Sequence, residues 1–496
     1  MANMPKSVTL KDVIEGGYCI GCGACAAAEP ELYELNMNEK GRFQAKPHPQ
    51  AGNEHDTALN VCPFSGRGPN ETQIAAEQFP ECSQSDGRIG SFLNCYVGYV
   101  AEGDFRKRGS SGGMGRWLAA QLMEKNMVDA VVQVMPGQTE VHAADPRQDG
   151  ESKLGVPLHT YRICRTKEEV LDASRSAYYP VEASNVLREV KEHPGRYLFI
   201  GTPCFVKAVR LLARVDEIFR ERIAYCIGIV CGHLKSSRYG EMIAWQEGIK
   251  PTEIRQLEFR KKYPGSKANQ KGMEFVYDDG GIELRKGNIV QRYFGTNYNL
   301  GLFKYEACDY CDDVLAETAD VVVGDAWLKD RIKDGRGTNI LIVREKSIET
   351  LVRQAIEESR LALDIVTADT IAESQAGGLR HRRDGLAYRL AKKKTDDVWY
   401  PSKRVEAQVG QLPLAEMRKY EMRLVLANEC DRIFEQARNR DSFKYFERKI
   451  TKLMEACESG TYWMSPLELV IYWARSFLMR AYWFARRLAS RIKHGR

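Results

Sequence analysis

The chain has 496 residues and a net charge of +6, from 73 Lys and Arg against 67 Asp and Glu. Hydrophobic residues make up 43 % and charged residues 28 %, an ordinary globular composition that excludes collagen-like, coiled-coil and disordered classes. The positive excess lies in the last 36 residues, which hold seven basic side chains and one acid. Residues 1–460 are neutral overall, whereas a nucleic-acid-binding protein would need a basic body, so no nucleic-acid partner is expected.

The start of the chain and its hydropathy indicate the cellular compartment, and hence the redox state, of the cysteines. The first 17 residues show no apolar segment behind a positive start, and no stretch of 18 residues is free of charge. We therefore expect neither a secretory signal nor a spanning helix, and we expect the 14 cysteines to be in a reducing cytoplasm. Cysteines in such number then indicate metal or redox chemistry rather than a disulfide scaffold.

The first cysteine group is the run CIGCGAC at residues 19–25. Three thiolates at this spacing, separated by small residues, can wrap a 4Fe–4S cluster. Glu29 stands where the bacterial ferredoxin run has its fourth cysteine, so the fourth ligand should come from a distant Cys-Pro pair. The expected ligands are Cys19, Cys22, Cys25 and Cys62. Zinc, which also accepts four thiolates, is the alternative.

From Asn94 onward the pattern changes to that of an α/β domain. Apolar runs, most of them separated by helical stretches, predict six strands. These are expected at Tyr96–Val100, Ala130–Val134, Tyr197–Ile200, Ile223–Val230, Ala319–Val323 and Ile340–Val343. After about Val366 the sequence predicts only helices and loops. No GxGxxG or P-loop motif is present, so a nucleotide would be bound without either device.

Turns rich in glycine and cysteine accompany these strands. Ser110–Gly113 opens an expected helix, and free amides at a helix N-terminus can bind a pyrophosphate. Gly201–Cys204 and Cys231 follow two strands, and ligands gather at the carboxyl ends of strands in open α/β sheets. With the C-x-x-C at residues 308–311, these cysteines are enough for a second four-thiolate site, although spacing alone does not show that they converge.

Several segments together resemble the beta-subunit family of deazaflavin-coenzyme (F-420) hydrogenases and dehydrogenases. They are SSGG at 110–113, SAYYPVEAS at 176–184, GTPC at 201–204, the strand end at Cys231, Phe259-Arg260, the C-x-x-C at 308–311 and ADVVVGDAW at 319–327. They occur in the family's order within residues 15–400. The chain is most similar to the bacterial branch often linked to polysaccharide synthesis, in members with an N-terminal ferredoxin-type motif.

The resemblance implies an α/β domain that binds FAD and a second 4Fe–4S cluster. The implied cluster ligands are Cys204, Cys231, Cys308 and Cys311. The implied flavin-binding residues are Ser110, Ser111, Gly112, Gly113, Ser176, Tyr178, Gly201, Thr202 and Asp325. Cys226 is the rival of Cys231, but it lies five residues earlier in the same strand, so alternation places it on the opposite face. His233 could donate a proton near the flavin or be structural, and no catalytic residue is assigned.

The end of the chain predicts one more helix. Ser465-Pro466-Leu467-Glu468 is a capping box with proline at the first helical position. Apolar residues at helical spacing then form one face, which the basic residues avoid, and Trp473 and Trp483 lie near its margins. This pattern is typical of a helix lying in a membrane surface, so we expect residues 465–493 to contact an anionic membrane. A helix docked on its own domain or on a partner is the alternative.

The predicted architecture is a mixed α/β catalytic domain, preceded by a ferredoxin-like iron–sulfur module and followed by an all-helical extension. Residues 1–90 are expected to form the 4Fe–4S module, 91–365 the flavin- and cluster-binding domain, 366–460 the helical extension and 461–496 the basic amphipathic helix.

The predicted function is that of an iron–sulfur flavoprotein oxidoreductase in the cytoplasm, peripheral on the inner face of the membrane. Electrons from a ferredoxin-like donor or a deazaflavin coenzyme would pass through two 4Fe–4S clusters to FAD and then to an organic substrate. Family analogy suggests a small-molecule or glycan-related substrate. One alternative is an electron-relay subunit of a larger redox complex with no substrate of its own, and another is a non-catalytic iron–sulfur scaffold or sensor.

Overall fold

The computed structural model describes residues 8–49, 56–137, 157–471, 473–475, 477–479 and 481. The chain divides into two compact units, Met1–Gln411 and Leu412–Arg496. Within the described residues, no helix combines the length and the hydropathy that crossing a bilayer requires. This division into two units does not test the four segments expected from the sequence, which remain a prediction.

Short helices and two hairpins form the N-terminal part of the first unit. The helices are α1 (Leu10–Glu15), α2 (Ala24–Ala28), α3 (Asp56–Val61) and α4 (Glu71–Gln78). The antiparallel hairpins pair β1 (Tyr33–Met37) with β2 (Phe43–Pro47) and β3 (Gln84–Asp86) with β4 (Gly90–Phe92). Cys19 and Cys22 lie in the loop between α1 and α2, Cys25 lies in α2, and Cys62 directly follows α3.

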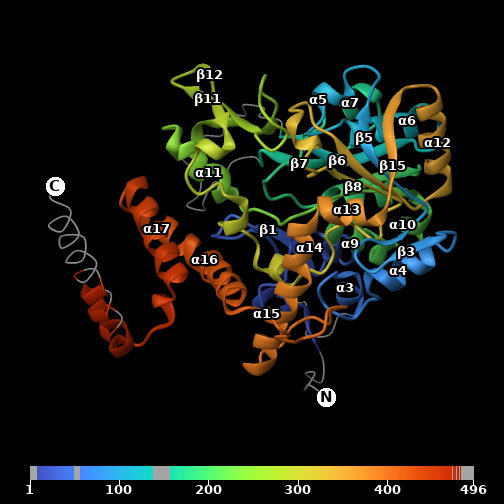
Figure 1. Cartoon of the computed structure of the whole chain (residues 1–496). Helices are drawn as coiled ribbons and strands as arrows, with labels where there is room; N and C mark the ends of the chain where they lie inside the picture. The colour runs from blue at the N-terminus through green and yellow to red at the C-terminus, as the bar shows by residue number, and fades with distance from the viewer. Residues whose placement is uncertain are drawn as a thin grey trace, which may run out of the picture. The chain divides into compact units, whose positions relative to one another are not determined.

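A mixed sheet of eight strands forms the centre of the first unit (Figure 1), in the order β15-β5-β14-β13-β9-β8-β6-β7. The four strands β13, β9, β8 and β6 run parallel, and the other neighbours pair antiparallel. The strands are β5 (Asn94–Val100), β6 (Ala130–Pro136), β7 (His159–Cys164), β8 (Tyr197–Gly201), β9 (Ile223–Ile229), β13 (Val321–Asp325), β14 (Asn339–Val343) and β15 (Leu361–Val366). The α/β class predicted from the sequence is confirmed.

The two faces of this sheet pack into different cores. Along β8, Tyr197 and Phe199 point to one core and Leu198 to the other, as side-chain alternation requires. The core around Leu198 contains apolar residues of α6 (Met114–Glu124) and α12 (Lys346–Glu357). The core around Phe199 contains α8 (Ser184–Glu192) and α9 (Pro203–Val215), together with residues of α2 and α3. The N-terminal part therefore packs on the α9 side of the sheet.

A second sheet and several helices complete the first unit. β10 (Ile254–Lys261), β11 (Gly272–Asp279) and β12 (Ile282–Ile289) form a three-stranded antiparallel sheet. The remaining helices are α5 (Phe105–Arg108), α7 (Lys167–Leu171), α10 (Glu217–Arg222), α11 (Ser237–Gln246), α13 (Ala368–Ser374), α14 (Ala376–Arg382) and α15 (Asp384–Thr395). The 3₁₀ turns are η1 (Pro251–Glu253), η2 (Val290–Arg292), η3 (Tyr298–Leu300), η4 (Glu306–Tyr310), η5 (Arg331–Lys333) and, in the second unit, η6 (Thr461–Trp463).

All six strands predicted after Asn94 are present, with ends shifted by one or two residues. The prediction missed β7 and β15, which lie at the two edges of the central sheet, and all of β10–β12. Edge strands and sheets with one solvated face alternate polar and apolar residues, so they lack the continuous apolar runs that mark the buried strands. In the described residues no strand follows β15, as predicted.

The second unit is helical. α16 (Leu414–Arg438) and α17 (Phe443–Ser459) pack together, with the rings of Phe434 and Phe446 edge to face at 5.3 Å. A further helix begins at Pro466, where the Ser465 backbone N–H donates to the Glu468 carboxylate at 2.8 Å and the Glu468 backbone N–H donates to the Ser465 hydroxyl at 3.4 Å. The predicted capping box is thus confirmed. The rest of the expected 465–493 helix is described only in part, because residues 472, 476, 480 and 482–496 lie outside the described residues.

We expect α9 to depend on one buried ion pair. Arg210 donates to the Asp320 carboxylate at 2.6 Å, and both side chains are almost fully buried. Arg210→Met leaves that carboxylate buried without its partner, which should lower the free energy of unfolding by about 3–5 kcal/mol. On the same helix, Arg214 pairs with Glu77 at the surface, so Arg214→Met should cost at most about 1 kcal/mol. Urea unfolding of the two variants measures the difference, and equal losses would contradict it.

Candidate functional site

The loop that carries the first cysteine group needs glycine between its cysteines. Gly21 and Gly23 adopt φ angles of +66° and +87°, in the left-handed region. A Cβ on Gly21 would lie 2.3 Å from the carbonyl oxygen of Phe43, and one on Gly23 would lie 2.5 Å from the backbone nitrogen of Ser184. Only glycine accepts both the backbone angle and this close approach. The small residues of the run therefore shape the loop so that its thiols point to one place.

The structure brings the four cysteines of this first set together. Burial raises the pKa of the Cys22 thiol well above its usual value, and the nearby thiols of Cys25, Cys62 and Cys19 raise it further. Burial raises the pKa of Cys25 in the same way, with Cys19 and Cys62 adding to it. The backbone N–H of Ala45 donates to Cys19 Sγ at 3.4 Å. Four thiols in one enclosed place form thiolates readily only beside positive charge.

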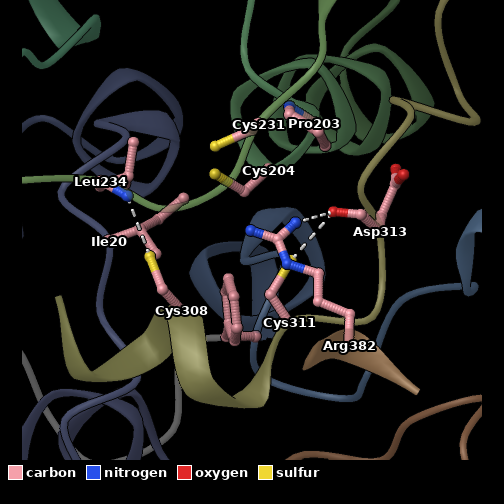
Figure 2. Close-up of a pocket in the computed structure, with 10 residues that line it drawn as sticks. Ile20, Pro203, Cys204, Cys231, Leu234, Cys308, Cys311, Asp313 and Arg382 are labelled. Carbon is pink, nitrogen blue, oxygen red and sulfur yellow. Dashed lines mark hydrogen bonds between the residues drawn. The ribbon is translucent and has the colours of Figure 1, made fainter. Parts of the chain in front are cut away.

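The second set converges at the carboxyl ends of two neighbouring parallel strands. β8 and β9 pair in parallel with Gly201 opposite Gly228, so Cys204 at the start of α9 lies near Cys231 after β9. Cys308 and Cys311 come from η4 and the residue after it. Figure 2 shows the four cysteines around one pocket. Burial raises the pKa of Cys204 well above its usual value, and Cys231, Cys311 and Cys308 raise it further.

Cys226 lies outside this pocket. Its backbone N–H donates to the Asp320 carboxylate at 2.5 Å, and its thiol lies near Arg210 and Asp320. The two cysteines of this segment thus have different surroundings.

The two cysteine sets are close neighbours. Ile20, from the first cysteine loop, and Phe64, just after Cys62, both line the pocket of the second set. Burial raises the pKa of the Tyr161 phenol, and cysteines of both sets, Cys204 and Cys22, raise it further. The Tyr161 phenol therefore lies within electrostatic range of both cysteine sets, and only a few side chains separate the two sets.

The pocket of the second set presents a buried donor that fits an inorganic cluster. Arg382 Nε is buried and has no hydrogen-bond partner. Arg382 lines the pocket, and its Nη1 donates to the carbonyl oxygen of Asp313 (Figure 2). Its Nη2 donates to the carbonyl oxygen of Gly232. In the described residues no three His, Cys, Asp or Glu side chains lie close enough to hold a single metal ion. A four-iron cluster is larger than one ion, spaces its thiolates more widely and offers acceptors to such a donor.

Aromatic rings lead away from the second set. The His233 ring stacks on Tyr298 at 3.9 Å, and the backbone N–H of His233 donates to the Tyr298 hydroxyl at 2.9 Å. A Cβ on Gly232 would lie 2.5 Å from the Tyr298 ring, so glycine permits this approach. Tyr298 in turn lies 5.8 Å from Tyr178, measured between ring centroids.

Tyr178 belongs to a group of the predicted flavin residues that meet around Arg260. Arg260 Nη2 donates to the Asp325 carboxylate at 2.6 Å, and its Nη1 donates to the Tyr178 hydroxyl at 3.3 Å. The hydroxyl of Ser176 donates to that of Ser110 at 3.2 Å, and the Ser110 carbonyl accepts from Arg260 at 3.4 Å. Arg260 is buried at a φ of +59°, and its Nε has no partner. Residues from four distant segments thus form one polar site.

The other predicted flavin residues serve the fold as well. A Cβ on Gly112 would lie 2.7 Å from the Asn339 side chain, and Gly113 has a φ of +94° at the start of α6. The Ser111 hydroxyl donates to a backbone carbonyl at 2.9 Å. Gly201 and Thr202 lie beside the second cysteine set, with the Thr202 hydroxyl 3.5 Å from Cys204 Sγ. These positions are therefore required by packing, whatever ligand lies nearby.

Five cations, which we call the cationic group, surround the Ser110–Gly113 turn. They are Arg116, Arg175, Arg260, Lys262 and Lys271. Lys262 donates to the carbonyl oxygen of Ser111 at 2.6 Å, and Lys271 donates to that of Gly335 at 2.8 Å. Burial, and after it the nearby cations with Lys271 first, lower the pKa of Lys262 to about 7. Burial and Arg260 lower the pKa of Lys271 to about 8. Such a group can bind an anion.

Two family models match the part of the chain that contains these residues. Residues 95–188 match the N-terminal part, and residues 195–369 match the C-terminal part, of the coenzyme F420 hydrogenase/dehydrogenase beta subunit. Together they cover more than half of the chain. The chain belongs to this family. It is therefore a member of a family of F420 oxidoreductase subunits, as its motifs predicted.

One solved structure with a similar chain is the xenon-derivatised F420-reducing [NiFe] hydrogenase complex from Methanosarcina barkeri. The match covers 66 % of this chain and 100 % of that chain, with 13 % identity and a TM-score of 0.44. No curated protein matches the chain.

Sequence reasoning missed most of the cationic group of this family member. Arg260 stands in a quoted motif, but Lys262 and Lys271 lie at the two ends of the loop between β10 and β11, two strands that the prediction also missed. The run Arg260-Lys261-Lys262 was the available signal. Three adjacent cations in a strand are usually solvent-exposed on at least one face, so only the fold reveals that two of them point inward.

We expect the cationic group to bind a diphosphate more tightly at lower pH. A bound anion raises the pKa of Lys262 from about 7, so binding takes up a proton. The affinity of nucleotide-free protein for ADP should fall by roughly tenfold between about pH 6 and about pH 8.5. Lys262→Met should weaken binding at the lower pH and remove most of the pH dependence. Lys261→Met, which removes a partner of Glu274, should change neither. Calorimetry at both pH values measures this, and a constant affinity would contradict it.

Proposed function

We propose that the chain is an iron–sulfur flavoprotein that transfers electrons from a ferredoxin-like donor or a deazaflavin coenzyme through two 4Fe–4S clusters to FAD. The final acceptor is an organic, glycan-related substrate. The observation that carries the proposal is a continuous series of sites. The first cysteine set adjoins the second across Ile20 and Phe64, and the second adjoins the Arg260 site through Tyr298 and Tyr178.

Each cofactor has a set of residues suited to it. The first cluster would be held by Cys19, Cys22, Cys25 and Cys62, and the second by Cys204, Cys231, Cys308 and Cys311. Ser110, Ser176, Tyr178, Asp325 and the cationic group suit the polar and diphosphate parts of FAD. When bound, the clusters supply one-electron chemistry and the flavin links it to hydride chemistry, while the protein positions and insulates them.

We expect the anaerobically purified protein to contain about eight irons and eight sulfides per chain, since each 4Fe–4S cluster holds four of each. Cys308→Ser should reduce both to about four, because it removes one thiolate of the second set. Cys226→Ala is the matched control, since Cys226 is a buried cysteine of the same region outside the pocket, and it should keep all eight. Four irons in the wild type, or an unchanged count in Cys308→Ser, would contradict the second cluster.

The relay alternative uses the same geometry without a substrate. Membership in a family of beta subunits supports an electron-transfer role and also fits a relay between a deazaflavin and a partner enzyme. Turnover by the purified chain alone supports the enzyme. Tight co-purification with a larger redox subunit, and no turnover without it, supports the relay. Absence of flavin supports the scaffold or sensor.

We further propose that the C-terminal helix docks the protein on an anionic membrane surface. Its apolar face is exposed in the described residues, with Leu467, Val470, Phe477 and Leu478 each 65–72 % exposed. The chain's positive excess lies in the same C-terminal segment, and basic residues near an anionic surface contribute about 1 kcal/mol each. Exposed apolar residues beside basic ones suit an interfacial helix better than a packed one.

The docking proposal predicts binding to anionic vesicles that weakens with salt without disappearing, because salt screens only the electrostatic part. Ending the chain at Gly460 should remove binding while iron and flavin contents stay unchanged. Phe477→Ser should weaken binding several-fold, since each buried CH₂ is worth about 0.8 kcal/mol. Met479→Ser, an exposed residue off the apolar face, should weaken it less. Vesicle sedimentation measures all four proteins, and equal sedimentation of the full and shortened chains would contradict docking.

A further inference from the structure

The two cysteine sets differ in the charge that surrounds them. Arg382, at the end of α14, is 2 % exposed and lies inside the second pocket (Figure 2). Its charge lowers the pKa of the Cys231 and Cys308 thiols, against the rise that their burial causes. Burial also raises the pKa of Cys311, which Arg382 and then Lys403 lower. Three of the four thiols therefore lie within range of one buried guanidinium.

The cations beside the first set are paired with carboxylates. Arg42 is buried and lines a pocket together with Cys19, and it pairs with Glu306 at 3.4 Å. After burial and the mutual effect of the thiols, the groups that act on Cys19, Cys22 and Cys25 are backbone N–H groups. Lys207 acts on Cys62, but it donates to the Glu71 carboxylate at 2.9 Å, which offsets its charge. Arg382, by contrast, forms no ion pair in the described residues, and its guanidinium donates to two backbone carbonyls at the second pocket.

We infer that Arg382 makes the cluster of the second set the more easily reduced of the two. This inference rests on the proposed function, because it presumes that both sets hold clusters. A reduced cluster carries one more negative charge than an oxidised one, so a fixed cation in a dry site stabilises the reduced form and raises its potential. Arg382 Nε, which lacks a partner, can also donate to a cluster sulfur, and such hydrogen bonds act in the same direction.

The consequence is a direction of electron flow. One electron leaves the first cluster, which is oxidised, and enters the second, which is reduced, with no proton transferred. The donor that reduces the first cluster is the external one-electron carrier of the proposed function. The second set adjoins the His233–Tyr298 stack, so an electron on the second cluster is nearer to the Arg260 site than one on the first cluster. Arg382 is thus a residue that tunes a cofactor.

The test is an anaerobic redox titration of the full-length holoprotein, followed by electron paramagnetic resonance. Arg382→Met removes the charge, Arg382→Lys keeps it, and Arg383→Met removes the neighbouring, more exposed cation as a control. We expect Arg382→Met to lower the equilibrium constant for reduction of the second cluster by at least about tenfold. For one electron, this is a fall of about 59 mV in its reduction potential. Arg382→Lys should retain most of the wild-type potential, and Arg383→Met all of it. The first cluster should keep its potential in each variant, and Cys22→Ser, which removes it, assigns the signals.

An unshifted potential in Arg382→Met would overturn the inference and leave the proposed function intact. A wild type with a single cluster would overturn both. If Arg382→Met does not retain its second cluster, the order of potentials in the wild type decides. A second cluster that is reduced before the first supports the inference, and the reverse order overturns it.

Discussion

Buried thiols constrain this structure more than any other group. A thiolate that has lost its water needs positive charge or hydrogen-bond donors around it, and two sets of four cysteines lie close together on one side of the central sheet. The surrounding elements supply these partners from separate parts of the chain. Backbone N–H groups of tight loops face the first set, and the guanidinium of Arg382, from α14, faces the second.

Charge continues to organise the molecule beyond the cysteines. Arg260 joins the Ser110 turn, Tyr178 and Asp325, and Lys262 and Lys271 lie nearby with depressed pKa values. Buried cations are costly unless an anion or a carboxylate compensates them. Arg260 pairs with Asp325, whereas Lys262 and Lys271 donate to backbone carbonyls, so these two lysines suit the bound anion that we propose. The second cysteine set and the Arg260 site share one feature. Each contains an arginine, Arg382 or Arg260, whose Nε is buried and has no hydrogen-bond partner.

Much of the candidate site could be predicted from local patterns. The run at residues 19–25, the turn at 110–113 and the C-x-x-C at 308–311 are short segments whose spacing limits what they can hold. For some residues, however, the sequence indicated only one of the two roles that they have. Gly112 and Gly113 suggested a phosphate site, yet the structure requires them because the backbones of α5, β5 and β14 pass close by. A motif that fits a ligand and a motif that fits a packing contact can be the same residues.

The sequence by itself determined the buried parallel strands, the three-cysteine run at residues 19–25 and the capped start of the C-terminal helix, because each depends on residues near one another in the chain. Tertiary structure alone decided that Cys204 and Cys231 meet, since that follows from the parallel register of β8 and β9. It also decided that Arg382 lines the pocket of the thiols and that Lys262 donates to the Ser111 carbonyl. Such contacts depend on how distant segments pack, and side-chain periodicity along one segment carries no information about them.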